Sequence, residues 1–96
     1  MNKRNPQLSV VIPALNEETT IRDCLSKLKT LRNSGSEIIV VDGGSHDKTV
    51  ELATPLCDHI YTSSASRAKQ MNIGAQHAAG DYLLFLHGDT SLPDDL

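Results

Sequence analysis

Short runs of branched aliphatic residues alternate along the chain with longer segments in which apolar residues recur every three or four positions. The first run occupies 8–12 and is stopped by Pro13, and similar runs lie at 37–42, 59–62 and 82–86. Continuous apolar, β-branched runs of this length are typical of strands buried on both faces. We therefore predict four strands, of which the third is the weakest and the fourth is apolar throughout.

The segments between these runs predict three helices. Apolar residues recur at helical spacing over 17–32, with Asn16 placed to cap the first turn. A short helix is expected over 47–53, and an alanine-rich helix over 66–79, whose stripe of alanines with Met71 is expected to face the core. Regular alternation of strands and helices implies parallel strands joined by right-handed crossovers. The predicted fold class is therefore α/β, a Rossmann-like three-layer α/β/α arrangement around a mostly parallel sheet.

Composition sets the size and character of this fold. The chain has 96 residues, of which 39% are hydrophobic and only 3% aromatic, so residues 1–96 form one small domain with an aliphatic core. A net charge of −3 supplies no global field for nucleic acid, which we exclude as a partner. No apolar run is long enough to cross a bilayer. We expect a cytoplasmic protein without a transmembrane segment, and peripheral membrane contact stays open.

Two cysteines, Cys24 and Cys57, lie in a predicted helix and just before a predicted strand. Two cysteines cannot complete a four-ligand zinc site, and no CxxC pair is present. We predict reduced thiols that serve in packing, as is usual in the cytosol, with a disulfide between them as the alternative.

Polar clusters follow three of the predicted strands directly, at 13–17, 42–45 and 87–89. In open parallel sheets, ligands bind outside the carboxyl ends of the strands, so these clusters are expected to share one rim. The chain lacks both the GxGxxG turn and the GxxxxGK[ST] loop that cradle phosphates in two common nucleotide-binding folds. Carboxylates on this rim could accept hydrogen bonds from a base or ribose, or hold a divalent cation that neutralises phosphates.

Three of the segments resemble a known family. Residues 10–18 (VVIPALNEE), 39–49 (IVVDGGSHDKT) and 84–89 (LFLHGD) resemble, in this order and spacing, the N-terminal half of family 2 glycosyltransferases with the GT-A fold. Residues 67–74 (RAKQMNIG) are similar to the helix that precedes the metal motif in that family. The closest likeness is to a small bacterial subgroup that carries Leu-His-Ala-Asp-Thr.

The resemblance implies a nucleotide-sugar site at the first two clusters. It places the backbone of Pro13 and Ala14 along the base and ribose, and Glu17 near the ribose or in the pocket lining. Asp42 would accept a hydrogen bond from the base, which is uracil in many members, and Gly44 would lie in the adjoining turn. The donor implied is a nucleoside diphosphate sugar, with a UDP-sugar expected.

The resemblance also implies a diphosphate and metal site. Arg67 or Lys69 would approach the diphosphate, while His87 and Gly88 would line the donor site. Asp89, the last position of a DxD-like motif, would coordinate Mg²⁺ or Mn²⁺, since hard cations take oxygen ligands. The first position of that motif is His87 rather than an aspartate, which leaves Asp89 as the one dependable carboxylate ligand.

Local structural roles compete with these functional ones. Asp42 could simply close a strand and start the turn that follows it. Asn16, Ser45 and Asp47 are favoured as helix-start residues rather than ligands. Histidines 46, 59 and 77 are expected to have no role in the site.

The resemblance further implies that family members continue well beyond Asp89. That continuation would supply the acceptor pocket and the general base, so no catalytic base is assigned and donor binding is the most we expect of this chain. An uncovered sheet edge or helix face would favour a homo-oligomer. The alternatives are a non-catalytic nucleotide-binding or self-associating module, a nucleotidyltransferase lacking its glycine-rich loop, and a phospho-receiver lacking its late lysine.

Overall fold

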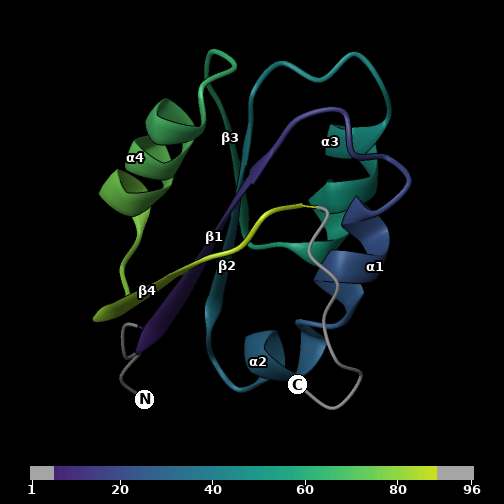
Figure 1. The fold of residues 1–96 in the computed structure, drawn as a ribbon. Coiled ribbons are helices and arrows are strands. Elements are labelled where there is room, and N and C mark those ends of the chain that lie inside the picture. Colours follow the sequence, from purple (N-terminus) through teal and green to yellow (C-terminus); the bar gives the residue numbers. More distant parts are fainter. Residues whose placement is uncertain (1–5, 89–96) are drawn as a thin grey trace.

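The chain folds around a four-stranded parallel sheet, as a computed structural model describes it for residues 6–88 (Figure 1). The strands are β1 (Leu8–Ala14), β2 (Glu37–Asp42), β3 (His59–Thr62) and β4 (Tyr82–Phe85), in the spatial order β3-β2-β1-β4. Every neighbouring pair is parallel. All four predicted strands are confirmed. The order places β1 at the centre, with its carboxyl end between those of β2 and β4.

Helices cover both faces of the sheet, which confirms the three-layer prediction. The helices α1 (Ile21–Ser26), α2 (Lys29–Asn33) and α3 (Thr49–Ala53) lie on one side, together with the 3₁₀ turn η1 (Thr54–Leu56). The helix α4 (Arg67–His77) lies alone on the other side (Figure 1). The single helix expected over 17–32 is wrong in detail, because it begins four residues later and is divided into α1 and α2.

Asn16 explains the late start of α1. It is the one non-glycine residue of the described chain with a positive φ, +52°, and its side-chain oxygen accepts a hydrogen bond from the His46 backbone N–H at 2.8 Å. A residue in the left-handed region cannot begin an α-helix, so the prediction of Asn16 as a helix cap is wrong. Asp47 does serve a helix start, because its carboxylate accepts the Thr49 N–H at the beginning of α3. The Thr49 hydroxyl also bonds to this carboxylate, and this bond, above all, lowers the pKa of Asp47.

The core is aliphatic and lies on both faces of the two central strands. Val10, Ile12, Ile38 and Val40 pack toward α1 and α3, while the alternate residues pack toward α4; these are Val11, Ile39 and Val41. All of these side chains are fully buried. The alternation follows from the two-residue repeat of a strand and explains the continuous apolar runs of β1 and β2.

The buried face of α4 differs from the prediction. Gln70 and Gly74 are its buried residues, whereas Ala68 is exposed and Met71 is only half-buried. At Gly74 the helix lies so close to β1 that an added Cβ would overlap Val11 Cγ1 and lie 3.2 Å from Cγ2. The expectation of an alanine stripe in the core is therefore only partly met: Ala78 packs against this core, but the buried positions of the helix are Gln70 and Gly74, where the backbone approaches the sheet closely.

β4 is an exposed edge strand, contrary to the expectation that its apolar residues are buried. Its residues are 39–65% exposed, and these are Tyr82, Leu83, Leu84 and Phe85. The strand pairs with β1 along one edge, and no described element packs across it closely enough to bury it. Burial is decided by neighbours in space, so an apolar run alone does not specify it. No helix of the described chain is long and apolar enough to cross a membrane.

Cys24 and Cys57 are both buried thiols and form no disulfide, in agreement with the prediction of reduced cysteines. Burial raises the pKa of Cys57 to about 11, so this sulfur is protonated at neutral pH. Because the thiolate is the reactive form of cysteine, Cys57 is suited to packing rather than to chemistry.

Candidate functional site

The loops after β1 and β2 are joined by hydrogen bonds. The Asn16 N–H donates to Ser45 Oγ at 2.9 Å, and the Glu17 N–H donates to Thr49 Oγ1 at 2.7 Å. The Glu18 N–H reaches the Asp47 carboxylate at 3.2 Å. These bonds connect residues about thirty positions apart and bring the first two polar clusters together at one end of the sheet, as the sequence predicts.

Asp42 lies at the end of β2 and is almost fully buried, with 3% of its surface exposed. One carboxylate oxygen accepts the backbone N–H groups of Gly44 and Ser45 at 3.0 and 2.9 Å. The other accepts the Ser45 hydroxyl at 2.5 Å. Gly44 has a φ of +96°, which glycine adopts readily and which this tight turn requires. Asp42 therefore shapes its own loop, and Ser45 supports Asp42 rather than capping a helix.

The third cluster packs against the beginning of α1. The Thr20 hydroxyl donates to the Gly88 carbonyl at 3.2 Å, and Cys24 Sγ lies 3.8 Å from the His87 carbonyl. A Cβ at Gly88 would overlap Glu17 Oε2, so the Glu17 carboxylate occupies the space beside this glycine. The loops after β1 and β4 are thus in direct contact.

A small cleft of about 150 Å³ opens between the loop after β1 and the start of α4. Its lining comes from the β1 loop, the start of α4 and the segment before it, and consists of Pro13, Ala14, Leu15, Glu17, Ala65, Ser66, Arg67 and Gln70. The Arg67 guanidinium reaches across to His87, with Nη1 at 2.5 Å from Nδ1 and 3.0 Å from Nε2. The cleft lies where the strand order reverses on either side of β1, which is where open α/β sheets bind ligands.

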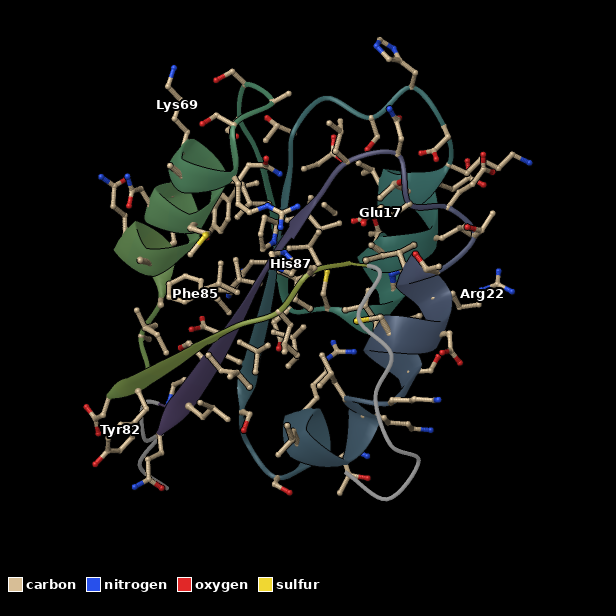
Figure 2. All side chains as sticks on the ribbon, in the orientation of Figure 1. Glu17, Arg22, Lys69, Tyr82, Phe85 and His87 are labelled. Carbon is tan, nitrogen blue, oxygen red and sulfur yellow. The ribbon has the colours of Figure 1, made fainter. Side chains whose placement is uncertain are left out.

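The residues expected in the site do not all line the cleft. Pro13, Ala14, Glu17 and Arg67 line the cleft. Asp42 and Gly44 form the adjoining turn, and His87 and Gly88 lie on the Arg67 and Glu17 side. Lys69 is exposed and projects outward from α4, away from Glu17 and His87 (Figure 2). Asp89 lies outside the described residues.

Gln70 is the buried polar residue of this cleft that the sequence interpretation did not assign. It is 4% exposed, and its amide nitrogen donates to the carbonyls of Ala14 and Val41 at 3.0 and 2.9 Å. A signal was present in the sequence, because Gln70 and Gly74 are four residues apart and share one face of the helix. The alanine-rich character of the neighbouring positions concealed that face.

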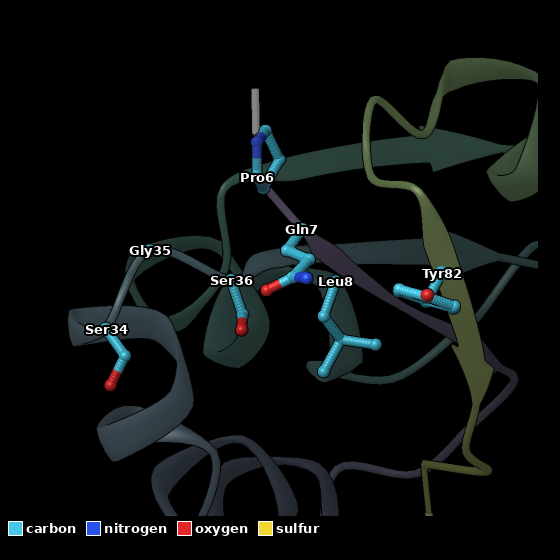
Figure 3. A pocket seen from close by; sticks show the side chains of 7 residues that line it. All are labelled: Pro6, Gln7, Leu8, Ser34, Gly35, Ser36 and Tyr82. Carbon is cyan, nitrogen blue, oxygen red and sulfur yellow. The ribbon is translucent and has the colours of Figure 1, made fainter. Parts of the chain in front are cut away.

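A second cavity lies at the opposite, amino-terminal end of the sheet (Figure 3). It has a volume of about 590 Å³ and is lined by Pro6, Gln7, Leu8, Ser34, Gly35, Ser36 and Tyr82. None of these side chains is charged. The smaller cleft, which joins a guanidinium, a carboxylate and a buried amide, is therefore the candidate functional site.

The residues that the structure describes do not form a metal site on their own. No group of three or more histidine, cysteine, aspartate or glutamate side chains within residues 6–88 could hold an ion. The Glu17 carboxylate lies beside Gly88, while the His87 ring faces a guanidinium. Divalent cations such as Mg²⁺ need more oxygen ligands than this.

With this geometry established, comparison with known proteins identifies the family. Residues 9–96 match glycosyl transferase family 2. The chain belongs to this family. A PGL/p-HBAD biosynthesis glycosyltransferase of Mycobacterium bovis is 31% identical over 94 residues, which cover 91% of this chain and 37% of that protein. The chain thus spans little more than a third of the length of this relative.

Solved structures of the same family share the fold. Glucosyl-3-phosphoglycerate synthase of Mycobacterium tuberculosis superimposes with a TM-score of 0.82 at 26% identity, over 94% of this chain and 37% of that one. A complex of that enzyme with Mn²⁺, UDP and glucosyl-3-phosphoglycerate gives a TM-score of 0.73 at 26% identity, over 86% and 33% of the two chains. The resemblance to family 2 glycosyltransferases and the GT-A fold are thereby confirmed.

Substituting Gly88 tests the contact between the β1 and β4 loops. We expect Gly88→Ala to destabilise the protein by about 1 kcal/mol, because the new methyl group displaces Glu17 Oε2, the end of a flexible side chain. Thermal unfolding measures the loss. In a Glu17→Ala background the same substitution is expected to cost less than half as much. Equal costs in both backgrounds would show that the two residues do not contact each other.

Proposed function

We propose that this chain forms the donor-binding part of a glycosyltransferase that transfers a sugar from a nucleoside diphosphate sugar, specifically a UDP-sugar, to an acceptor. The observation that carries the proposal is a cleft lined by Arg67 and Glu17 at the carboxyl ends of the strands, beside loops after β1, β2 and β4 that are bonded to one another. Family membership supports glycosyl transfer as the reaction class. Because the chain spans about a third of its relatives, the acceptor site and general base are not assigned to its residues.

The diphosphate is assigned to the Arg67 side of the cleft. Arg67 is the first residue of α4, an eleven-residue helix whose Ser66 cap accepts the Lys69 N–H. The amino end of a helix carries partial positive charge, and a guanidinium pairs well with phosphate oxygens. Both features favour an anion at this end. Arg67 is the preferred of the two candidate cations, because it lines the cleft whereas Lys69 projects outward from α4.

The nucleoside is assigned to the opposite side, along the Pro13–Ala14 backbone and toward Asp42. Asp42 accepts three hydrogen bonds from its own loop, which leaves one lone-pair position of its carboxylate for a base. Glu17, which lines the cleft, can accept hydrogen bonds from ribose hydroxyls.

A divalent metal is part of this proposal, with Asp89 as its protein ligand. When bound, Mg²⁺ or Mn²⁺ would neutralise charge on the leaving diphosphate. The solved complex of the mycobacterial relative contains both Mn²⁺ and UDP, which supports the assignment.

Isothermal titration of the 96-residue chain with UDP tests the proposal. We expect binding in the presence of Mn²⁺ that is weakened at least tenfold by EDTA, because the metal offsets repulsion between the diphosphate and nearby carboxylates. Asp89→Ala should reduce binding to the EDTA level, whereas Asp81→Ala, at an exposed position before β4, should not. A folded chain that binds no nucleoside diphosphate with metal present would favour the non-catalytic alternative.

That alternative has one observation in its favour, the exposed apolar residues of β4. An uncovered strand edge can pair with a second copy of the chain. A homo-oligomer is therefore part of the proposal. Cytoplasmic localisation is a separate part of it. Sedimentation velocity across a range of protein concentrations measures this self-association.

A further inference from the structure

We propose that Gln70 is a positioning residue of the donor site, which ties the ends of β1 and β2 together where the nucleoside is assigned. It acts through the backbone carbonyls of Ala14 and Val41, and not by touching the ligand. This inference rests on the proposed function, because it concerns the same cleft. Three observations support it: the burial of the amide, the two strands that it joins and the groups that adjoin the joined carbonyls.

Gln70 is the buried polar side chain of α4, whose other polar residues are all exposed. It is 4% exposed, and burial of an amide costs free energy unless hydrogen bonds satisfy it. Its Nε2 donates to the Ala14 carbonyl at 3.0 Å and to the Val41 carbonyl at 2.9 Å, and both bonds are buried. An amide nitrogen carries two hydrogens, so both are used. The nitrogen therefore serves the site through these carbonyls.

The two carbonyls belong to neighbouring strands. Ala14 is the last residue of β1, and Val41 is the last but one of β2. The two strands pair in parallel, with Ala14 opposite Asp42. Gln70 bonds to both from the face of the sheet that α4 covers. A single side chain thus joins the carboxyl ends of β1 and β2 to each other and to this helix.

The same bonds fix the peptide that leaves β1. The Ala14 carbonyl accepts the Gly43 N–H at 2.9 Å as well as the Gln70 amide, so both of its lone pairs are engaged. A peptide group is planar, and an oriented carbonyl therefore also orients the N–H that follows it. This N–H belongs to Leu15, and it faces the Glu17 carboxylate at 3.4 Å. Gln70 consequently determines how the chain enters the cleft.

The joined carbonyls adjoin the groups that the proposed function assigns to the nucleoside. One belongs to the 13–14 backbone itself, and the other directly precedes Asp42. A change in the separation of the two strand ends would move these groups relative to each other. Arg67 lies one helical turn before Gln70 on α4, so the same side chain also connects them to the helix of the phosphate side. A site held in its binding geometry in advance loses less entropy when the ligand binds.

The docking of α4 does not depend on this amide alone. One turn beyond Gln70, the helix contacts the sheet where Gly74 lies against Val11. Loss of the amide bonds is therefore expected to leave α4 in place while the ends of β1 and β2 become free to move.

Titration with UDP in the presence of Mn²⁺ tests the proposal. Gln70→Met has a side chain of similar size without an N–H, and we expect it to bind UDP about tenfold more weakly. In an Asp42→Ala background the same substitution should cost less than about threefold, because a group that Gln70 positions is already missing. A merely structural role would cost the same in both backgrounds. Gln76→Met, at an exposed position of α4, should retain the full affinity.

A measurement on the unmodified chain tests the inference even if Gln70→Met does not fold. Exchange of side-chain amide hydrogens with water is followed by nuclear magnetic resonance. We expect the NH₂ of Gln70 to exchange at least about tenfold more slowly than that of the exposed Gln76, because both of its hydrogens are bonded to buried carbonyls. Equal exchange rates would overturn the inference.

Two titration results would also overturn it while leaving the proposed function intact. One is unchanged UDP affinity in a folded Gln70→Met chain. The other is the same loss of affinity from Gln70→Met with Asp42 present and with Asp42 replaced by alanine, which would indicate a general effect on the fold. If the unmodified chain binds no UDP with Mn²⁺ present, the proposed function fails and this inference fails with it.

Discussion

Asp42→Ala is expected to weaken UDP binding about 100-fold. The carboxylate accepts two backbone N–H groups and one hydroxyl from the 44–45 turn, and bonds to a charged acceptor contribute about 1.5–3 kcal/mol each. Loss of the base contact, together with loss of the support that the turn gives the donor site, is expected to cost about 3 kcal/mol of binding free energy, which corresponds to that factor. The turn would open, and because the Ser45 hydroxyl also accepts the Asn16 N–H, the loop after β1 would lose its support as well. Calorimetry with UDP and Mn²⁺ measures the change.

Asp42→Asn separates the two roles assigned to this residue. An asparagine oxygen can still accept the N–H groups of Gly44 and Ser45, and its NH₂ can donate to the Ser45 hydroxyl. The turn is therefore expected to survive with binding reduced about tenfold rather than 100-fold. Wild-type affinity in a folded Asp42→Ala chain would show that neither the turn nor the carboxylate takes part in donor binding.

Gly74→Ala is expected to destabilise the fold by about 2 kcal/mol. Alanine is the better helix former by about 1 kcal/mol, but inserting a methyl group into a packed core costs up to about 3 kcal/mol. The upper end of this packing cost applies here, because the added Cβ would overlap Val11 Cγ1. Val11 is a fully buried, β-branched residue of the central strand and cannot move aside. Denaturant unfolding followed by circular dichroism measures the loss.

Two companion variants make this test specific. Gln76→Ala, at an exposed position of the same helix, should leave the free energy of unfolding unchanged or slightly higher. Val11→Ala removes the overlapping methyl groups, so Gly74→Ala should cost clearly less in that background than in the unmodified chain. A stabilising effect of Gly74→Ala alone would mean that α4 lies farther from β1 than the structure shows. Because Gln70 is on the same face of α4, such a result would also weaken the assignment of Gln70 to the cleft.

The cleft combines groups of opposite charge in a small space. The Arg67 guanidinium and the Glu17 carboxylate both line it, one from α4 and the other from the loop after β1. At about 150 Å³ the cleft is smaller than the roughly 300–1,000 Å³ of most small-molecule sites. It can hold one portion of a nucleoside diphosphate sugar, in keeping with a chain that spans about a third of its relatives.

Local patterns in the sequence specify the strands, their parallel arrangement and the rim on which the polar clusters meet. An apolar run between helical segments indicates a buried parallel strand, and the carboxyl end of that strand marks where the next loop begins. These patterns suffice to place the loops containing Glu17, Asp42 and Gly88 at one end of the sheet. The same three segments identify the family, because their order and spacing are specific.

Packing between distant segments determines which faces are buried and which side chains enter the cleft. β4 has the apolar composition of a core strand, yet it is exposed because no described element covers it. Asparagine is a residue type that commonly caps helices, yet the Asn16 side chain accepts a hydrogen bond from the backbone N–H of His46, thirty residues away. Gln70 reaches the cleft because Gly74 lets α4 approach β1 and Gly43 leaves room for the amide. Contacts of this kind depend on how the elements come together in three dimensions, and local sequence patterns carry no information about that.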